Sequence, residues 1–269
     1  VSGSGPWPPL REGSPAGNTM AMARQSEPLA EPHVPVLVTR PQAEGEAFAT
    51  ALAARFGARV RPVVVPLIAP RYLTPPIADH NYAAVMFTSA HAVEGARRLG
   101  IRLPSLAWCV GRKTASVATA AGFQARSADR DADALAKAVL ADPPNGRILY
   151  LRGVDTHHNI LEMLNDSGIS VDVAIVYVQE PQPLTAEALA LLHSPGPVLV
   201  PLFSPRTATL FRAGLPLDTA AQLHIAAMSP AVARAVGDLP RAALIIARHP
   251  DAPAMLDAVK SLLAGMPAA

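Results

Sequence analysis

A chain of 269 residues, half of them hydrophobic and 16% charged, is long enough for two α/β domains of about 100–120 residues each. Its net charge of +2 is too small for the basic face of a nucleic-acid-binding protein, and no apolar run approaches the roughly 20 residues that span a bilayer. The single cysteine, Cys109, excludes an internal disulfide and a cysteine-based metal cluster.

The first 33 residues differ in composition from the rest of the chain. They are rich in Pro, Gly, Ser and charged residues and show no hydrophobic periodicity. Such a segment cannot bury enough apolar surface to offset the entropy lost on ordering. We therefore expect a disordered tail over residues 1–33 that takes no part in function. It has no apolar stretch typical of a secretory signal, and Met20 or Met22 could be the natural start.

After the tail, short apolar runs alternate with amphipathic stretches. The runs predict strands over 35–39, 59–65, 83–88, 106–110, 147–151, 171–177, 198–203, 224–228 and 243–247. The stretches predict helices over 42–56, 91–99, 113–121, 131–141, 156–167, 184–193, 206–213, 230–237 and 251–264. This alternation indicates parallel sheets covered on both faces. Gly57, Gly122 and Gly168 are predicted left-handed helix caps, and Asp251 is a predicted helix start.

One strand–turn–helix pattern occurs twice. Residues 36–41 and 148–153 are apolar runs that reach an arginine at a turn, and a helical stretch follows each. Two further pairs of similar segments follow in the same order: 85–89 with 199–204, and 108–111 with 226–229. The repetition predicts an α/β fold of two similar lobes, each a parallel sheet flanked by helices, with a ligand-binding cleft between them. Two proline-containing segments, 66–70 and 177–181, are predicted to cross between the lobes.

The loops after the predicted strands contain the candidate binding residues. Ligands of open α/β sheets bind at such loops. Here they are rich in hydroxyls, glycines and arginines, and each is expected where a helix begins: 39–41, 88–90, 111–114, 152–153, 204–206 and 229–230. Free backbone N–H groups at several helix starts would together bind a polyanion, although a single serine or threonine there is often only an N-cap.

Common cofactor and metal motifs are absent or incomplete in the sequence. The segment 111–114 lacks the leading glycine of a P-loop, and an arginine separates its glycine from its lysine. No Gly-x-Gly-x-x-Gly follows a strand, and the nucleophile elbow of hydrolases is missing. His157 and His158 are adjacent and point to different helix faces, so they predict solvated side chains or anion contacts, not a metal pair.

A few single residues allow two interpretations. Tyr177 ends an apolar strand at a predicted crossing, where it could be a hinge anchor or a proton donor. His91 follows the loop at Ser89 and could line the cleft. His249 and Asp251 could lie near the cleft or cap a helix. Cys109 lies in an apolar run and is expected to be a buried, unreactive thiol.

Taken together, these segments resemble the uroporphyrinogen-III synthase family. The resemblance extends from Val34 to Leu263 and is carried by Val-Leu-Val-Thr-Arg-Pro at 36–41, Phe-Thr-Ser at 87–89, Val-Gly-Arg-Lys-Thr-Ala at 110–115, Leu-Arg-Gly at 151–153, Val-Tyr at 176–177 and Phe-Ser-Pro-Arg-Thr-Ala at 203–208. It implies a lyase of tetrapyrrole and heme biosynthesis. The substrate would be hydroxymethylbilane, a linear tetrapyrrole with eight carboxylates. The enzyme would remove the terminal hydroxyl as water, invert the last pyrrole ring and close the macrocycle.

The resemblance also implies a domain layout and site residues. Lobe one would combine 35–67 with 181–264, lobe two would span 71–176, and the crossings would form a two-stranded connector. Tyr177 would donate a proton to the leaving hydroxyl. With Arg40 and Arg152 of the loops, the expected substrate-binding residues are Arg40, Thr88, Ser89, Gly111, Thr114, Arg152, Ser204 and Ser229. The resemblance implies a cytoplasmic monomer without metal or organic cofactor, and without nucleic-acid or membrane partners.

Two non-catalytic interpretations stay open from the sequence. The chain could be a two-lobed small-anion-binding protein, although it lacks a secretory signal. It could also be a regulatory tetrapyrrole-pathway protein that has lost activity. Ala231 and Val232 support the second interpretation, because some family members have hydroxyl side chains there. His91 is a further departure, since Asn is common at its position in the family.

Overall fold

The computed structural model describes residues 33–129, 131–155 and 159–266. The predicted tail, apart from His33, and the pair His157-His158 lie outside these described residues. Within them, the strands form one sheet of five strands and one of six. No helix in the described part of the chain is long and apolar enough to cross a membrane.

The first sheet is parallel and has the strand order β11-β10-β9-β1-β2. Its strands are β1 (Val34–Val38), β2 (Val60–Val64), β9 (Gly196–Leu202), β10 (Ala221–Ala227) and β11 (Ala243–Ile246). Side chains on both faces of the central strands are buried, as Val36 and Leu37 show with 0% exposure each. Burying each such side chain contributes about 1.5–3 kcal/mol.

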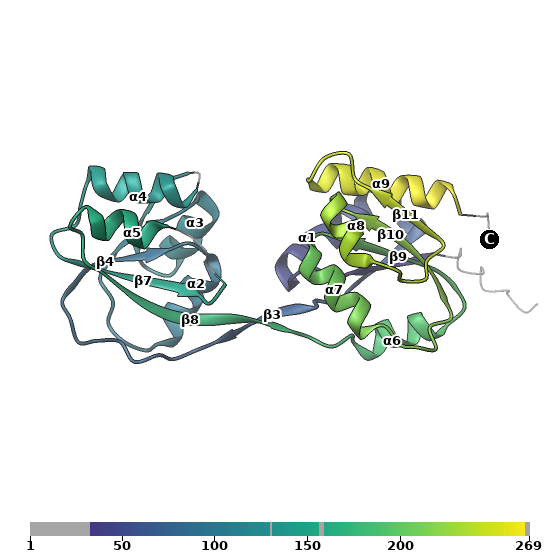
Figure 1. Cartoon of the computed structure of the whole chain (residues 1–269), viewed down its shortest axis with the longest axis horizontal. Coiled ribbons are helices and arrows are strands. Elements are labelled where there is room, and N and C mark those ends of the chain that lie inside the picture. The colour runs from purple at the N-terminus through teal and green to yellow at the C-terminus, as the bar shows by residue number, and fades with distance from the viewer. Residues whose placement is uncertain (1–32, 130, 156–158, 267–269) are drawn as a thin grey trace, which may run out of the picture. The chain divides into compact units, whose positions relative to one another are not determined.

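Helices cover both faces of this first sheet (Figure 1). One face packs against α6 (Ala186–His193), α7 (Pro205–Gly214) and α8 (Pro230–Val236). The other face packs against α1 (Gln42–Phe56) and α9 (Ala252–Ala264). This is the covered parallel sheet that the alternating sequence predicts, and its strands come from two stretches of the chain, 34–64 and 196–246.

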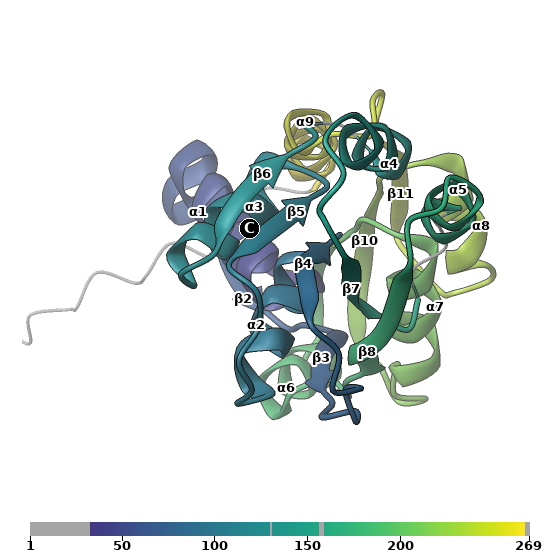
Figure 2. The ribbon, with the colours of Figure 1, turned by 90° about the vertical axis from the view of Figure 1, so that its left-hand side faces the viewer.

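The second sheet has the strand order β3-β8-β7-β4-β5-β6. Its strands are β3 (Ile68–Tyr72), β4 (Tyr82–Phe87), β5 (Leu106–Cys109), β6 (Gln124–Ser127), β7 (Arg147–Gly153) and β8 (Val171–Pro181). One face packs against α2 (Ala90–Arg98) and α3 (Arg112–Ala120), and the other against α4 (Ala132–Ala141) and α5 (Ile160–Asp166). Figure 2 shows α4 beside α5, away from α2 and α3.

The two proline-containing crossings pair with each other. β3 runs antiparallel to the end of β8, from the pair Ile68 and Pro181 to the pair Tyr72 and Tyr177 (Figure 1). Pro70 is tolerated because β3 is an edge strand and needs no second set of ladder hydrogen bonds. The predicted two-stranded connector is therefore confirmed. Because it belongs to the second sheet, that sheet is mixed and not purely parallel as predicted.

Three local differences from the sequence prediction have simple causes. β6 is absent from the predicted strands because it is a polar edge strand whose side chains alternate between exposed and partly buried. β7 continues to Gly153, so Arg152 lies in a strand and not at a helix start as predicted; α5 begins only at Ile160. Gly57 has the expected positive φ of 56°, but its ψ of −136° lies outside the left-handed helical region, because a 3₁₀ turn over Gly57–Arg59 follows.

The glycines predicted at two helix ends have positive φ, and the predicted start of the last helix is confirmed. Gly122 and Gly168 have φ values of 95° and 80°. The Asp251 carboxylate accepts a hydrogen bond of 2.8 Å from the Ala254 N–H at the start of α9. It is therefore a helix cap, which satisfies one of the N–H groups that a helix start leaves without a partner.

Candidate functional site

Each sheet has a point where the direction of strand addition reverses. In the first sheet, β2 lies on one side of β1 and β9 on the other, so the reversal lies between β1 and β9. In the second sheet, the chain adds β5 and β6 beside β4, and then β7 on the opposite side. Ligands of open α/β sheets bind at the carboxyl ends of the strands at such switch points.

The predicted binding residues cluster at these two switch points. Arg40 follows β1, and Ser204 follows β9. Thr88 and Ser89 follow β4, and Arg152 lies at the end of β7. Gly111 after β5 and Ser229 after β10 occupy the neighbouring strand ends. The topology therefore brings each group of loops to one edge of its own sheet.

Three of the predicted serines are N-caps. The hydroxyl oxygens of Ser89, Ser204 and Ser229 accept the N–H groups of His91, Thr207 and Val232 at 3.1, 3.1 and 3.4 Å. The cap role therefore accounts for their position, as is common for a serine where a helix begins. A capping hydroxyl accepts through oxygen, so its proton can still be donated to a carboxylate. At Ser204 this proton has a partner within the protein: the Thr207 hydroxyl donates to the Ser204 carbonyl at 3.0 Å, so the Ser204 hydroxyl is the donor in the 3.0 Å contact between the two hydroxyls.

The remaining loop residues of the second sheet differ in accessibility. Gly111 is the N-cap of α3, and no atom lies within 4 Å of a Cβ placed there, so the space on the side where a side chain would stand is open. Thr114 is 7% exposed and its side chain is packed into the protein, so it offers little surface to a ligand. The hydroxyls of Thr88 and Tyr150 lie 3.2 Å apart. Tyr150 is 1% exposed, and burial raises the pKa of its phenol.

A β-bulge sets the orientation of Tyr177. In the ladder between β7 and β8, Arg152 pairs with Ile175 but Gly153 pairs with Tyr177, so Val176 is an extra residue. Without the bulge, Tyr177 would face away from Val176, because successive side chains alternate. With it, both residues join Ala174 in the core cluster under α2. Bulges commonly re-aim a side chain next to a functional site.

Two glycines allow the close packing around this bulge. A Cβ on Gly153 would lie 2.5 Å from Cζ of Tyr177 and 2.9 Å from its hydroxyl oxygen, so the phenol ring rests against the Gly153 backbone. A Cβ on Gly95 of α2 would lie 2.7 Å from Cβ of Val176. Tyr177 is 8% exposed, and no hydrogen bond of its hydroxyl is found among the described residues. The phenol proton is therefore not committed to a protein acceptor in this part of the chain.

His91 and Tyr72 complete the surroundings of Tyr177. The ring centroids of His91 and Tyr177 lie 5.6 Å apart with an interplanar angle of 55°, which is within the range of aromatic packing. The Tyr72 hydroxyl and Nδ1 of His91 are 3.3 Å apart. Burial lowers the pKa of the half-buried His91. Its imidazole is therefore neutral at neutral pH.

In the first sheet, an arginine stacks on an aromatic ring. The guanidinium of Arg40 lies 4.2 Å from the ring centroid of Phe203, which itself meets Phe48 edge-on at 4.9 Å. Burial lowers the pKa of Arg40, and the nearby Glu44 opposes that shift. The hydroxyl of Thr39, which is 1% exposed, has no hydrogen-bond partner among the described residues.

Several loop cations have carboxylate partners. Lys113 Nζ lies 2.7 Å from Glu44, and Arg206 lies 2.8 Å from Asp155 and donates to the Gln179 carbonyl. Arg112 lies 3.5 Å from Asp129. The half-buried Arg152 donates to the Gly153 carbonyl at 3.4 Å and lies 6.0 Å from the Tyr150 ring centroid. These cations are dispersed and mostly paired, and they do not form one cluster.

The other chemically active side chains lie elsewhere. Cys109 is fully buried, and burial raises the pKa of its thiol to about 12, so it is the unreactive thiol that its apolar surroundings predict.

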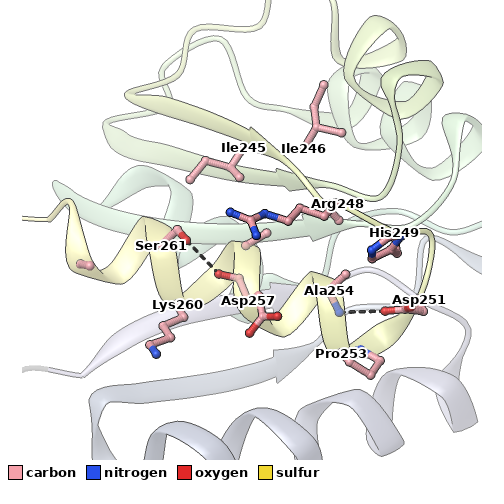
Figure 3. A pocket seen from close by; sticks show the side chains of 13 residues that line it. Ile245, Ile246, Arg248, His249, Asp251, Pro253, Ala254, Asp257, Lys260 and Ser261 are labelled. Carbon is pink, nitrogen blue, oxygen red and sulfur yellow. Dashed lines mark hydrogen bonds between the residues drawn. The ribbon is translucent and has the colours of Figure 1, made fainter.

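A hollow of about 740 Å³ lies between β11 and α9, and Figure 3 shows His249 and the capping Asp251 beside it. A second hollow of about 790 Å³ lies beside Tyr82. Neither contains a predicted binding residue. No group of three or more metal-ligating side chains occurs among the described residues.

Sequence reasoning missed two residues near Tyr177. Tyr72 belongs to a proline-containing crossing, and only the antiparallel register of β3 and β8 reveals that it lies opposite Tyr177. Gly153 was part of a loop with Arg152, but its closeness to the phenol follows from the bulge. The Leu-Arg-Gly segment at 151–153 includes Gly153, but its sequence does not indicate that Tyr177 packs against it.

Comparisons with known proteins agree with this fold. The family model described as uroporphyrinogen-III synthase HemD matches residues 46–257. Uroporphyrinogen-III synthetase from Helicobacter pylori 26695 is similar in structure, with a TM-score of 0.53, 17% identity and coverage of 86% of this chain and 99% of that chain. A mutant uroporphyrinogen III synthase from Thermus thermophilus matches with a TM-score of 0.42, 18% identity and coverage of 87% and 100%. No curated protein matches the sequence. The structural agreement rests on the Helicobacter protein.

Proposed function

The chain belongs to the uroporphyrinogen-III synthase family, and from this premise we propose that Tyr177 is the proton donor of its reaction. Members of this family are lyases of porphyrin biosynthesis. They remove the terminal hydroxyl of hydroxymethylbilane as water, invert the last pyrrole ring and close the macrocycle. The match over residues 46–257 includes Tyr177, the switch point of the second sheet and the loops after β9 and β10, and it begins after β1 and Arg40.

The surroundings of Tyr177 carry the proposal. Its ring is held by the bulge and by Gly153, while its hydroxyl has no protein acceptor among the described residues. A phenol fixed in this way can protonate a departing hydroxyl, which then leaves as water. The electron pair of a pyrrole nitrogen assists the departure, so the acid supplies only part of the driving force. We therefore assign Tyr177 a modest catalytic contribution and assign most of the rate to holding the substrate.

We propose that the substrate carboxylates bind at the helix starts of the two switch points. Ser89, Gly111, Ser204 and Ser229 are N-caps, and after each of them at least one first-turn N–H group has neither a helical acceptor nor the cap hydroxyl as its partner. At the starts of α7 and α8 this group belongs to the second helical residue, because the first is Pro205 or Pro230 and has no N–H. These N–H groups and the positive end of the helix dipole attract anions, each helix contributing roughly 0.3–1 kcal/mol. Arg40 and Arg152 add charge and hydrogen-bond donors, Thr88 adds a hydroxyl, and Thr114 shapes its loop from the buried side.

This binding mode specifies a conformation of the linear tetrapyrrole. The cationic intermediate left after loss of water can close without ring inversion. A protein that grips several carboxylates can bring the inverted terminal ring to the ring-closing position first. Ordered N–H groups and hydroxyls suffice for this task, and no step requires a metal ion or an organic cofactor.

We also propose the domain layout that the family resemblance implies. The strand membership of the two sheets supports a lobe one of 35–67 plus 181–264 and a lobe two of 71–176, with β3 and β8 as the connector. The substrate would bind in a cleft between the lobes. The family resemblance further supports a cytoplasmic protein that is a monomer. Size-exclusion chromatography with light scattering would test the monomeric state.

The deciding experiment is an isomer assay. Purified protein is mixed with freshly generated hydroxymethylbilane, and the products are oxidised and separated by chromatography. The proposal predicts the ring-inverted type III isomer with wild-type protein. It predicts slower formation of this isomer with Tyr177→Phe, by about 100-fold or less, at an unchanged melting temperature. Only the uninverted isomer with wild-type protein, at the rate seen without protein, would contradict the proposed function.

A further inference from the structure

We propose that His91 is a positioning residue for Tyr177 and that Tyr72 fixes the orientation of its imidazole. The inference rests on the proposed function, in which the Tyr177 phenol donates a proton to the leaving hydroxyl. His91 itself is not assigned a proton transfer. Its role is to keep the phenol ring in the geometry that the reaction needs.

The position of the His91 ring is determined from three directions. Its backbone N–H donates to the Ser89 hydroxyl at 3.1 Å, which fixes the first turn of α2. Its Nδ1 lies 3.3 Å from the Tyr72 hydroxyl, and its ring packs 5.6 Å from that of Tyr177. A half-buried imidazole with these partners has few alternative rotamers. The His91 ring therefore limits the positions that the Tyr177 phenol can take.

Tyr72 is held by contacts outside this pair. It lies opposite Tyr177 in the antiparallel ladder, so β3 and β8 fix its backbone relative to the phenol. The guanidinium of Arg98 lies 4.1 Å from the Tyr72 ring centroid, and Glu94 accepts a 2.8 Å hydrogen bond from Arg98. Tyr72 therefore pairs with β8, the strand that contains Tyr177, and also forms a hydrogen bond with His91 of α2. One residue thus connects β8 with α2.

The charge state of His91 suits a positioning role. Burial lowers its pKa, while the charges of Glu44 and Lys113 act in opposite directions on it. The neutral ring can accept from or donate to the Tyr72 hydroxyl, and it places no fixed charge beside the phenol. On the side of β7, Gly153 leaves space for the Tyr177 ring, because any side chain at this position would collide with the ring. His91 and Gly153 thus restrict the same ring from two different elements.

A double-mutant cycle tests this role. We expect His91→Ala to lower kcat about tenfold with KM nearly unchanged, because misplacement of a catalytic group by about 1 Å can cost up to 100-fold. We expect His91→Phe, which keeps a ring beside Tyr177, to restore part of that loss. Tyr72→Phe should show a smaller loss of the same kind. In a Tyr177→Phe background, His91→Ala should have almost no further effect, because the group it positions is gone.

The outcomes separate this inference from the proposed function. If wild-type protein forms no type III isomer, the proposed function is wrong. If Tyr177→Phe is slow but His91→Ala is not, or if the two losses multiply in the double variant, only the positioning role is wrong. His193→Ala, which changes an exposed histidine of α6, is the matched control and should retain wild-type kcat. If His91→Ala does not fold, Tyr72→Phe in both backgrounds decides the question, since it removes one oxygen atom only.

Discussion

The close approach of Gly153 to Tyr177 makes Gly153→Ala a sharp test of how the phenol is held. The new Cβ would lie 2.5 Å from Cζ and 2.8 Å from Cε2 of Tyr177, distances at which carbon atoms cannot coexist. Neither atom can yield easily, because Tyr177 is 8% exposed and sits in the bulge packed under α2. Either the phenol ring or the end of β7 must therefore move.

The expected cost follows from this overlap. Inserting a methyl group into a packed site destabilises a protein by about 1–3 kcal/mol. For a domain of this size, each kcal/mol lowers the melting temperature by roughly 2–4 °C. We expect a measurable drop in melting temperature together with a fall in kcat at least as large as that of Tyr177→Phe, because the displaced phenol no longer reaches the leaving hydroxyl.

A matched glycine substitution provides the control. Gly214 ends α7, and a Cβ there would meet only Leu184 at an ordinary 3.8 Å, so Gly214→Ala should be neutral or slightly stabilising. Differential scanning fluorimetry and the isomer assay are run on both variants. A Gly153→Ala protein with wild-type melting temperature and kcat would refute the reasoning, because it would mean that Tyr177 has another accessible position and is not held by Gly153.

Three further predictions concern stability and cofactor dependence. Burial lowers the pKa values of His91 and His224, so between these values and the ordinary value near 6.5 the unfolded chain binds more protons, and the free energy of unfolding should rise with pH through this window and then level off. Urea unfolding between pH 5 and 8 measures this, and His224→Gln should flatten the profile; an equally steep profile would show that other groups cause it. Asp251→Ala removes the cap of α9 and should cost about 1 kcal/mol, whereas a change below about 0.3 kcal/mol, measured by urea unfolding, would mean that solvent replaces the cap. Chelator treatment should leave type III isomer formation unchanged, and loss of activity with recovery on adding a divalent ion would contradict the metal-free mechanism.

Local chemistry was sufficient to predict most elements of this fold. Apolar runs such as 36–38 are buried on both faces of a sheet. A continuous apolar run predicts a parallel strand that helices cover on both sides, and this prediction does not depend on which strands lie beside it. Asp251 and the serine caps accept hydrogen bonds from residues two or three positions away, so the sequence alone predicts them. β6 escaped prediction because its strand state comes from pairing with β5 and not from its own polar side chains.

The geometry of the candidate site depended on contacts between residues far apart in the chain. Its place at the end of an apolar strand singled out Tyr177, and the family resemblance implied its role, but the direction of its side chain follows from one extra residue in β8 relative to β7, a register that no local pattern encodes. Tyr72 meets His91 only because β3 returns antiparallel along β8. Gly153 matters because of a ring that lies 24 positions further along the chain. The sequence by itself determined most of the strands, helices and caps, since those depend mainly on neighbours in the chain; tertiary structure decided the edge strand β6 and which side chains surround the phenol, since these depend on strand pairing and register.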